Sequence, residues 1–377
     1  MKCKLEEIVD VTMGQSPKSE YYNTEKNGYP FLQGNRTFGF KYPTFDTYTT
    51  VMTKFAKAGD VIMSVRAPVG ALNITPVDMC LGRGVCSLRM KNGNQSFLFY
   101  MMKYYVSHLI KKESGTVFGS VNRNDINGLE VDIPEDIEEQ KKIARYLEMI
   151  DDKIELNNAI NNNLEQQAQA IFKTEFLSLK ALPSGWRQAT LIDIADYLNG
   201  LAMQKYRPSG NEIGIPVLKI KELRQGCCDD NSELCSPNIK NEYIIHDGDV
   251  IFSWSGSLLV DFWCGGISGL NQHLFKVTSS KYDKWFYYAW TKHHLDHFIY
   301  IATDKATTMG HIKRDELAKA EVFIPHEADY RRIGALLQPI YDLIISNRIE
   351  NKRLALLRDT ILPKLISGKL DTSSIVT

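Results

Sequence analysis

A long-period duplication constrains the fold of this 377-residue chain more than any other feature of its sequence. Three short sets of residues recur in the second half, at offsets of 186, 189 and 191. They are Leu5, Ile8, Asp10 and Gly14, matched by Leu191, Ile194, Asp196 and Gly200; Gly59 to Ile62, matched by Gly248 to Ile251; and Glu130, Val131, Ile133 and Pro134, matched by Glu321, Val322, Ile324 and Pro325. Loop insertions explain why the offset increases by only a few residues along the chain. We therefore expect two copies of one scaffold that carry different surfaces.

Each copy divides into two parts of different character. Residues 1–134 and 183–325 alternate short apolar runs with turn residues, interrupted by helical stretches, which predicts two similar mixed α/β domains. Residues 135–182 and 326–377 are predicted to be long spacer helices, the second with a C-terminal tail. The expected fold class is therefore α+β, with two similar mixed α/β domains joined by two long antiparallel coiled-coil helices and an internal pseudo-two-fold symmetry.

The helices are predicted from a heptad seam that lasts about four heptads. The seam residues match between the two copies at a constant offset of 190. In the first copy they are Ile143, Leu147, Ile150, Ile154, Asn157, Asn161, Leu164, Ala168 and Ile171, and in the second Ile333, Leu337, Ile340, Ile344, Asn347, Asn351, Leu354, Arg358 and Ile361. An ordinary amphipathic helix explains the apolar positions but not two asparagines in the same two layers of both helices. Polar seam residues fix register at a cost in stability, so we assign that role to the asparagines.

The direction of pairing follows from chain length. A helix over residues 136–180 is about 60 Å long, and the second domain begins almost at once, so the second helix must return antiparallel to the first. The register that pairs the polar layers sets Asn157 beside Asn351 and Asn161 beside Asn347. It also sets Ile154 against Leu354, Leu164 against Ile344 and Leu147 against Ile361, and leaves Arg358 opposite Ile150 as the one poor layer.

Charge and composition exclude several classes of protein. The chain has 45 basic and 45 acidic residues, which excludes a strongly basic protein that coats DNA indiscriminately. The sequence contains no run of 18 apolar residues, so it predicts no membrane span, and no secretory signal follows Met1. We therefore expect a cytoplasmic protein with reduced thiols. Cys227, Cys228 and Cys235 fit no standard zinc spacing, and His293 and His297 share a helix face without a third ligand nearby.

The chain resembles the DNA-specificity (S) subunit of type I restriction-modification systems over essentially its whole length. The resemblance rests on the order of several short motifs together with the duplication. They are Leu182-Pro183-Ser184-Gly185-Trp186 followed by Leu191, Asp193 and Ile194; the two Gly-Asp-Val-Ile runs; Leu270-Asn271-Gln272-His273; Gly310-His311-Ile312; and Leu365-Ile366-Ser367-Gly368-Lys369-Leu370. In the first half Arg83-Gly84-Val85 replaces the Asn-Gln-His of the second.

The resemblance implies a non-catalytic subunit of a larger complex. Each domain would read one half of a bipartite double-stranded DNA target, while the helices space the halves and dock two adenine methyltransferase subunits. A restriction subunit would join to cleave DNA. S-adenosylmethionine, ATP and Mg would be bound by those partners, and no cofactor is expected in this chain. In agreement, the sequence contains neither an Asp/Asn-Pro-Pro-Tyr/Phe methyltransferase motif nor a P-loop.

Candidate DNA contacts are cations and amides in loops that flank the shared frame, since Arg suits guanine and Asn or Gln suits adenine. In the first domain they are Gln33, Asn35, Arg36, Arg66, Arg83 and Arg123, and in the second Lys219, Lys221, Arg224, Gln272, His273 and Arg314. Arg123 and Arg314 occupy matching positions, and Gln272 and His273 lie in a motif, so a framework role is the alternative for these four. Residues 1–134 carry a net charge of +4 and residues 183–325 one of −2, which predicts weak DNA affinity for the isolated chain.

Two other functions fit parts of the sequence. A scaffold with two peptide-binding modules on a coiled-coil bridge, and no DNA, would show the same heptads and domains. An enzyme is the weaker alternative, because no nucleophile and base stand together in the sequence.

Overall fold

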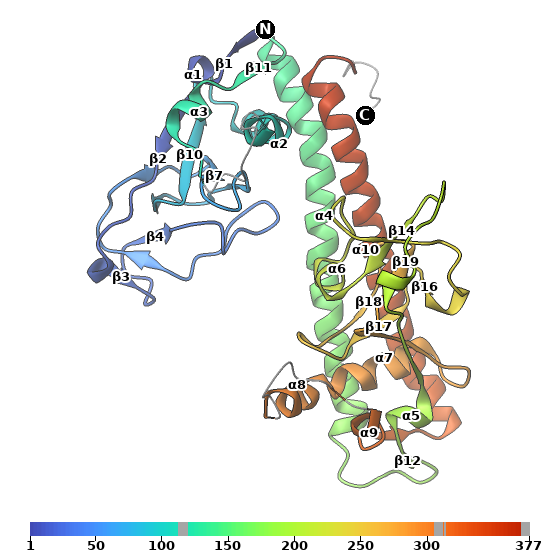
Figure 1. Cartoon of the computed structure of the whole chain (residues 1–377). Coiled ribbons are helices and arrows are strands. Elements are labelled where there is room, and N and C mark those ends of the chain that lie inside the picture. The colour runs from blue at the N-terminus through green and yellow to red at the C-terminus, as the bar shows by residue number, and fades with distance from the viewer. Residues whose placement is uncertain (112–119, 305–311, 313, 371–377) are drawn as a thin grey trace. The chain divides into compact units, whose positions relative to one another are not determined.

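A computed structural model describes residues 1–111, 120–304, 312 and 314–370 (Figure 1). The chain forms two compact units, and each unit takes a stretch from both halves of the sequence. Unit 1 comprises Met1–Glu155 with Leu354–Thr377, and unit 2 comprises Leu156–Arg353. Both long helices therefore contribute to both units.

Unit 1 contains three small sheets. A four-stranded antiparallel sheet has the order β2 (Val9–Met13), β10 (Val85–Met90), β7 (Val61–Ser64), β8 (Leu72–Ile74). A five-stranded sheet has the order β3 (Tyr22–Asn23), β5 (Tyr48–Thr49), β4 (Tyr29–Leu32), β9 (Met79–Leu81), β6 (Phe55–Ala56), and in it β4 and β9 run parallel. The third pairs β1 (Lys2–Lys4) with β11 (Glu130–Asp132). The helices of this part are α1 (Leu5–Ile8), the 3-10 turn η1 (Ser19–Tyr21), α2 (Gln95–Lys111) and α3 (Arg123–Asn127).

Unit 2 repeats this arrangement except for one strand, since its second sheet has no counterpart of β3. Its antiparallel sheet has the order β13 (Asp196–Asn199), β20 (Leu274–Thr278), β17 (Val250–Ser253), β18 (Leu259–Phe262). The second sheet has the order β15 (Leu234–Cys235), β14 (Ile215–Leu218), β19 (Ser268–Leu270), β16 (Ile244–Ile245), and β14 and β19 are again parallel. β12 (Arg187–Thr190) pairs with β21 (Glu321–Ile324). The predicted duplication is thus a duplication of topology.

The helices of unit 2 show where the copies differ. They are α5 (Leu191–Ile194), the 3-10 turns η3 (Met203–Lys205) and η4 (Asn241–Tyr243), α6 (Ile220–Gln225), α7 (Lys284–His293), α8 (Leu295–Asp304) and α9 (Arg314–Leu317). The continuous α2 of unit 1 corresponds to the two helices α7 and α8, which meet at His294. In unit 1 no helix follows β4, whereas α6 follows the matching strand β14.

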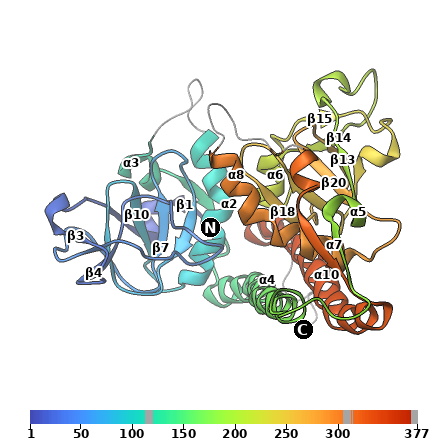
Figure 2. The same cartoon turned by 90° about the horizontal axis from the view of Figure 1, so that it is seen from below.

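Each core lies between the antiparallel sheet and the helix that covers it. All four residues of β7 and all four of β17 are buried, as expected for strands covered on both faces. The covering helices carry unbroken aromatic and apolar runs, Phe97 to Met102 in α2 and Trp285 to Trp290 in α7, and all of these residues are buried. Figure 2 shows α2 beside β7 and β10 in unit 1. The aromatic residues of α7 are therefore core residues, and none of them forms a stacking platform.

The two long helices are α4 (Ile137–Phe172) and α10 (Glu327–Ile366). The domain limits proposed from sequence, 134/135 and 325/326, fall in the short connections that precede these helices. α4 ends earlier than the sequence predicts, because the π-helical turn η2 (Lys173–Leu177) follows it and the chain leaves the helical conformation before residue 180. α10 ends at Ile366, and residues 371–377 lie outside the described part of the chain.

The helices pair antiparallel, with the asparagine partners that the sequence predicts. In unit 2 the Asn157 side chain donates to that of Asn351 at 2.9 Å, and Asn347 donates to Asn161 at 2.9 Å. Asn157 and Asn161 are 1% and 5% exposed. A buried amide requires a hydrogen-bonding partner, so a shift of one helix turn would break these bonds and leave the amides unsatisfied.

The prediction that Arg358 forms a poor layer is wrong. In unit 1 its guanidinium donates to the carboxylate of Asp151 at 2.7 Å, and its Nε donates to Asp359 at 2.8 Å. Asp151 is fully buried and also accepts a hydrogen bond from the hydroxyl of Tyr100 at 2.9 Å, while Lys103 lies 3.5 Å away. A heptad count considers only the seam position opposite Arg358, and Asp151 is the next residue along the helix from Ile150.

Candidate nucleic-acid interface

In unit 1 the ends of the parallel strands bring three predicted DNA contacts together. Strands β4 and β9 end at the same edge of their sheet, so Gln33 and Arg83 follow them side by side. Gly84 N–H donates to the Gln33 carbonyl at 2.9 Å, and Val65 N–H donates to the Gly84 carbonyl at 2.9 Å. These two hydrogen bonds also place Arg66 at this edge. We call Gln33, Asn35, Arg36, Arg66 and Arg83 the recognition edge of unit 1.

Glycine is required at the centre of this edge. A Cβ atom on Gly84 would lie 2.3 Å from the Gln33 carbonyl oxygen, and one on Gly14 would lie 2.0 Å from the Gly82 carbonyl oxygen. Side chains at either position would push the loops apart. The glycines therefore let three backbone segments meet closely enough for their neighbours to face one site.

Charge pairing separates the cations of the recognition edge into two kinds. Arg36 forms an ion pair with Asp46 at 2.6 Å, and this guanidinium lowers the pKa of the Asp46 carboxyl below its ordinary value. Arg66 and Arg83 are exposed, and neither forms an ion pair with any residue that the structure describes. A pocket of about 150 Å³ adjoins Arg36 and Gln33. Arg66 and Arg83 are thus the two side chains best placed to contact phosphates or guanine.

The matching edge of unit 2 carries a different set of groups. Asn271 N–H donates to the Leu218 carbonyl at 3.2 Å, the equivalent of the Gly82 to Leu32 bond at 2.8 Å in unit 1. His273 Nδ1 lies 3.0 Å from the hydroxyl of Ser255, and the amide of Gln272 lies 3.4 Å from His273 Nε2. Neutral hydrogen-bonding groups therefore occupy the places that Gly84, Arg66 and Arg83 hold in unit 1.

The cations predicted for unit 2 lie on and before α6. Lys219 pairs with Glu233, and Lys221 pairs with Asp229 at 3.2 Å, and in each case the cation lowers the pKa of the carboxyl. Arg224 is exposed and has no ion pair with a described residue. A shallow depression lies beside Lys221 and Arg224. Gln272, His273, Lys219, Lys221 and Arg224 form what we call the recognition edge of unit 2.

Arg123 and Arg314 hold the frame together. The guanidinium of Arg314 donates to the Tyr197 carbonyl at 2.7 Å, and that of Arg123 donates to the Val11 carbonyl. Val11 and Tyr197 are themselves equivalent residues of β2 and β13, at an offset of 186. The geometry therefore favours a structural role for both arginines, and a DNA contact by either remains a prediction.

Some residues of the edges gave no signal in the sequence. The Trp254 indole donates to the Asn199 side chain at 3.0 Å, and its ring lies 6.2 Å from that of His273. Ser16 accepts a hydrogen bond from the Arg83 backbone at 3.1 Å. These residues are distant in sequence from the edges they support, and only the tertiary fold identifies them.

His294, which lies between the candidate ligands His293 and His297, has a structural role in unit 2. His294 Nε2 donates to the Glu321 carbonyl at 2.8 Å, and burial lowers the pKa of His294 to about 4. Among the described residues no group of three His, Cys, Asp or Glu is placed to hold a metal ion, and all seven cysteines are free. No helix in the described part of the chain combines the length and apolar character needed to cross a membrane.

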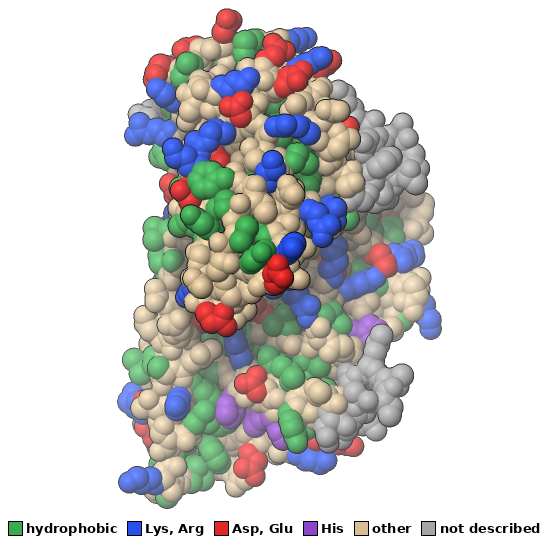
Figure 3. All heavy atoms as spheres, turned by 90° about the vertical axis from the view of Figure 1, so that its left-hand side faces the viewer, with side chains coloured by type: hydrophobic (Ala, Val, Ile, Leu, Met, Phe, Trp, Pro, Cys, Tyr) green, Lys and Arg blue, Asp and Glu red, His purple; other side chains and the backbone are tan. Residues whose placement is uncertain are grey.

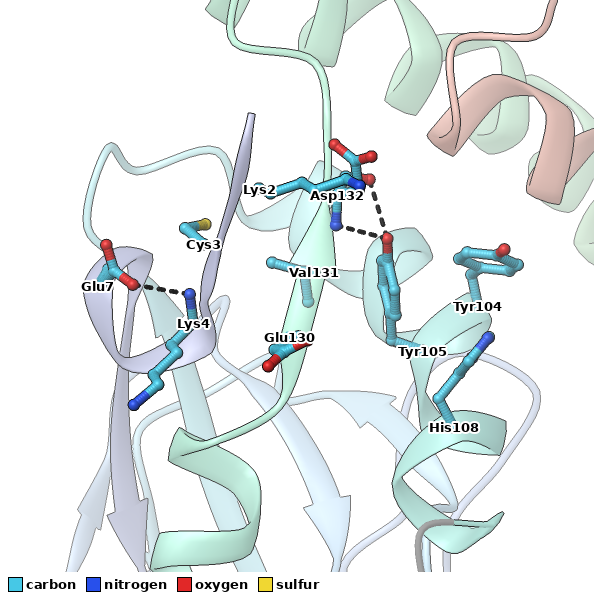
Figure 4. A pocket seen from close by; sticks show the side chains of 10 residues that line it. All are labelled: Lys2, Cys3, Lys4, Glu7, Tyr104, Tyr105, His108, Glu130, Val131 and Asp132. Carbon is cyan, nitrogen blue, oxygen red and sulfur yellow. Dashed lines mark hydrogen bonds between the residues drawn. The ribbon is translucent and has the colours of Figure 1, made fainter.

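A pocket of unit 1 lies away from the recognition edge. It has a volume of about 560 Å³ and lies between the β1–β11 pair and α2 (Figure 4). The Tyr105 hydroxyl fills one side by accepting from the Asp132 amide at 2.7 Å and donating to the Asp132 carbonyl at 2.8 Å. The pocket is lined by lysines and by carboxylates, so its charges favour neither an anionic nor a cationic ligand.

The face of the molecule in Figure 3 shows no continuous basic field. Lys and Arg side chains lie among acidic and apolar ones, in agreement with the zero net charge. On this face, any attraction for a phosphate backbone must therefore be local.

Comparisons with known proteins decide the family. The family model described as "Type I restriction modification DNA specificity domain" matches residues 1–166 and again residues 183–356. The chain belongs to the type I restriction-modification DNA specificity family. The two matches correspond to the two copies of the scaffold, so each copy is one such domain.

Two relatives and one solved structure are similar to the chain. A putative type I restriction enzyme MjaX specificity subunit of Methanocaldococcus jannaschii is 36% identical over 168 residues, 44% of this chain and 39% of that protein. The MjaIX specificity subunit of the same organism is 25% identical over 403 aligned positions, 97% of this chain and 92% of that protein. The crystal structure of the S subunit of a type I restriction-modification system from M. genitalium shares the fold, with a TM-score of 0.59 and 16% identity over 97% of this chain and 96% of that one.

Proposed function

We propose that this protein is the specificity subunit that directs a type I restriction-modification complex to a bipartite double-stranded DNA target. Each unit contacts one half of the target through its recognition edge, and the paired helices set the spacing between the halves. The observation that carries the proposal is the repetition of one strand order with two different sets of side chains at the same edge.

The chemistry of the edges suggests how the two half-sites differ. Arg66 and Arg83 donate in the geometry that guanine O6 and N7 accept, whereas Gln272 can both donate to and accept from adenine. The two units would thus read dissimilar half-sites from one shared frame. Arg36, Lys219 and Lys221 must exchange a carboxylate for a phosphate before they can contact DNA, which reduces what each adds to affinity.

The chain itself performs no catalysis in this proposal. Two adenine methyltransferase subunits dock on it and supply S-adenosylmethionine, and a restriction subunit supplies the ATP- and Mg-dependent cleavage, all in the cytoplasm. The absence of a methyltransferase motif and a P-loop from the sequence supports this division of labour. A scaffold with two peptide-binding modules is disfavoured, because both copies match a DNA specificity domain.

The test is a map of N6-methyladenine in genomic DNA, obtained by single-molecule sequencing with and without the gene for this chain. We expect one split motif with a fixed spacer to be methylated only when the gene is present. A methylation pattern that is unchanged by deletion, with the partner methyltransferase expressed, would contradict the proposal.

A further inference from the structure

A loop of unit 1 joins the recognition edge to the long helices. It runs from Gln33, after β4, to Asp46, and its two sides are held by hydrogen bonds from Thr44 N–H to the Thr37 carbonyl at 2.9 Å and from Gly39 N–H to the Tyr42 carbonyl at 3.2 Å. We call residues 37–44 the anchor hairpin. Arg36 and Asp46 close its base, next to the recognition edge, and Phe40 and Lys41 form its tip. Figure 1 shows this loop extending from β4 toward α4.

The tip contacts the helices through charges and an aromatic ring. The ammonium of Lys41 forms an ion pair with Asp152 of α4 at 3.2 Å, although the Lys41 side chain is only 7% exposed. The ring of Phe40 lies under two cations, with Lys103 of α2 at 5.7 Å and the guanidinium of Arg358 at 5.9 Å from its centroid. Cation–π contacts of this kind are stronger when the cation is shielded from water, as Arg358 is.

The tip packs against a buried, hydrogen-bonded cluster. Asp151, Arg358 and Tyr100 form the buried hydrogen-bonded cluster described above, and Lys103 adds a second cation beside it. On the opposite side, the Asn73 amide holds the backbone of Gly39 twice, donating to its carbonyl and accepting from its N–H, both at 3.0 Å. The anchor hairpin is therefore fixed at its tip by the helices and at its side by β8.

Unit 2 offers a comparison within the same chain. Its strand β14 leads directly into α6, with no hairpin between them. The contact with a long helix is made instead by strand β18, whose Asp261 forms an ion pair with Arg348 of α10 at 2.6 Å. The anchor hairpin is thus a feature of unit 1 alone among the described residues, and any effect of its tip should be confined to the half-site that unit 1 contacts.

We propose that Phe40 and Lys41 are positioning residues for DNA specificity: they lock the anchor hairpin to the helices and thereby hold Asn35 and Arg36 at the recognition edge in one orientation. The inference rests on the proposed function, because it assumes that unit 1 contacts a half-site. It assigns no DNA contact to either residue. Their role is to select one conformation of the loop that makes such contacts.

The experiment uses the full chain assembled with its partner methyltransferase and measures methylation of synthetic duplexes. The duplexes carry the split motif found by the genomic map, with single base changes in one half-site at a time. The variants are Phe40→Ala and Lys41→Met, the second of which keeps most of the apolar stem and removes the charge. Tyr29→Ala and Lys57→Ala serve as matched controls, since both side chains are exposed and have no described contact with the helices.

We expect each variant to lose about fivefold to tenfold of the discrimination between correct and changed bases in the half-site of unit 1, which is part of what one bidentate base contact provides. Discrimination in the other half-site, the preferred spacer and the melting temperature should stay as in wild type and in the controls. Unchanged discrimination in both half-sites, or an equal loss in both, would overturn the proposal while leaving the specificity function intact. If wild type itself fails to discriminate, the proposed function has failed instead.

Discussion

The buried carboxylate of Asp151 offers the most demanding test of how unit 1 is held together. Asp151 has no exposed surface, and the Arg358 side chain that pairs with it is only 10% exposed. Asp151→Leu removes the carboxylate and leaves the guanidinium buried without that partner. Breaking a buried ion pair from one side typically costs about 3–5 kcal/mol. Arg358 keeps its contact with the exposed Asp359, so we expect a loss near the lower end, about 3 kcal/mol.

Two secondary effects act in the same direction. The hydroxyl of Tyr100 loses its acceptor, and burial together with the Asp151 charge is what raises the pKa of Tyr100 in the wild type. Lys103 loses a nearby counter-charge, and its pKa is already lowered by burial and by Arg358. Both groups would then be buried with poorer partners, which disfavours the folded state further.

The control is the double variant Asp151→Leu with Arg358→Leu. Replacing both members of a buried pair by apolar groups is often neutral or stabilising, so we expect this variant to recover most of the loss, less what Tyr100 and Lys103 still lose without Asp151. The duplication supports the expectation. At the offset of 190, Asp151 corresponds to Tyr341 and Arg358 to Ala168, and both of these residues of unit 2 are buried and uncharged.

The assay is thermal and urea unfolding of the purified chain, followed by circular dichroism. For a body of 150–250 residues, about 3 kcal/mol corresponds to a fall in melting temperature of about 6–12 °C. A loss below about 1 kcal/mol in the single variant would refute the reasoning. So would a double variant as unstable as the single one, since the instability would then come from altered packing or from the partners that Tyr100 and Lys103 lose, and not from an unpaired guanidinium.

Three further predictions concern the pH response, the helix register and DNA contact. Burial lowers the pKa of His294 to about 4, so between about pH 6.5 and 4 the unfolded chain binds a proton that the folded chain does not. The free energy of unfolding should therefore fall as the pH is lowered through this range. His294→Gln can still donate to the Glu321 carbonyl, and it should flatten this slope in melting temperatures measured across the same range. Asn161→Leu leaves Asn347 buried without its partner and should cost about 1–3 kcal/mol in urea unfolding, and adding Asn347→Leu should recover most of it; a double variant that is no more stable than the single one would exclude a coupled pair. Arg83→Ala should weaken binding of the assembled complex to its target, and a loss confined to one base pair would indicate a base contact, whereas a uniform loss with a smaller salt dependence would indicate a phosphate contact.

The sequence predicted the long-range pairing of the helices because their register is written in a periodic pattern. The seam repeats every seven residues, and the four asparagines mark two layers that satisfy each other only in one antiparallel alignment. Hydrogen bonds between Asn157 and Asn351 and between Asn161 and Asn347 confirm it. The existence of two mixed domains was likewise predictable, since the duplication is visible as repeated residues at nearly constant offsets.

The candidate site was predictable only in part, because its residues meet through non-local backbone contacts. Parallel pairing of β4 with β9 joins segments about 50 residues apart, and no local pattern specifies it. That pairing brings Gln33 and Arg83 to one edge, and the hydrogen bond from Val65 N–H to the Gly84 carbonyl adds Arg66. Arg123 has a sequence context that looks equally suited to DNA contact, but its guanidinium donates to the Val11 carbonyl.

The sequence by itself determined the duplication, the antiparallel helices and the family to which the chain belongs, because each depends on residue type repeated at fixed spacing. Only the tertiary structure decided which charges are free and which are paired. A heptad count places Arg358 in an unfavourable layer, and the fold supplies Asp151 from the neighbouring position and Tyr100 from another helix. Pairing of this kind depends on distances of a few ångströms between elements that are remote in the chain, and such distances exist only once the chain has folded.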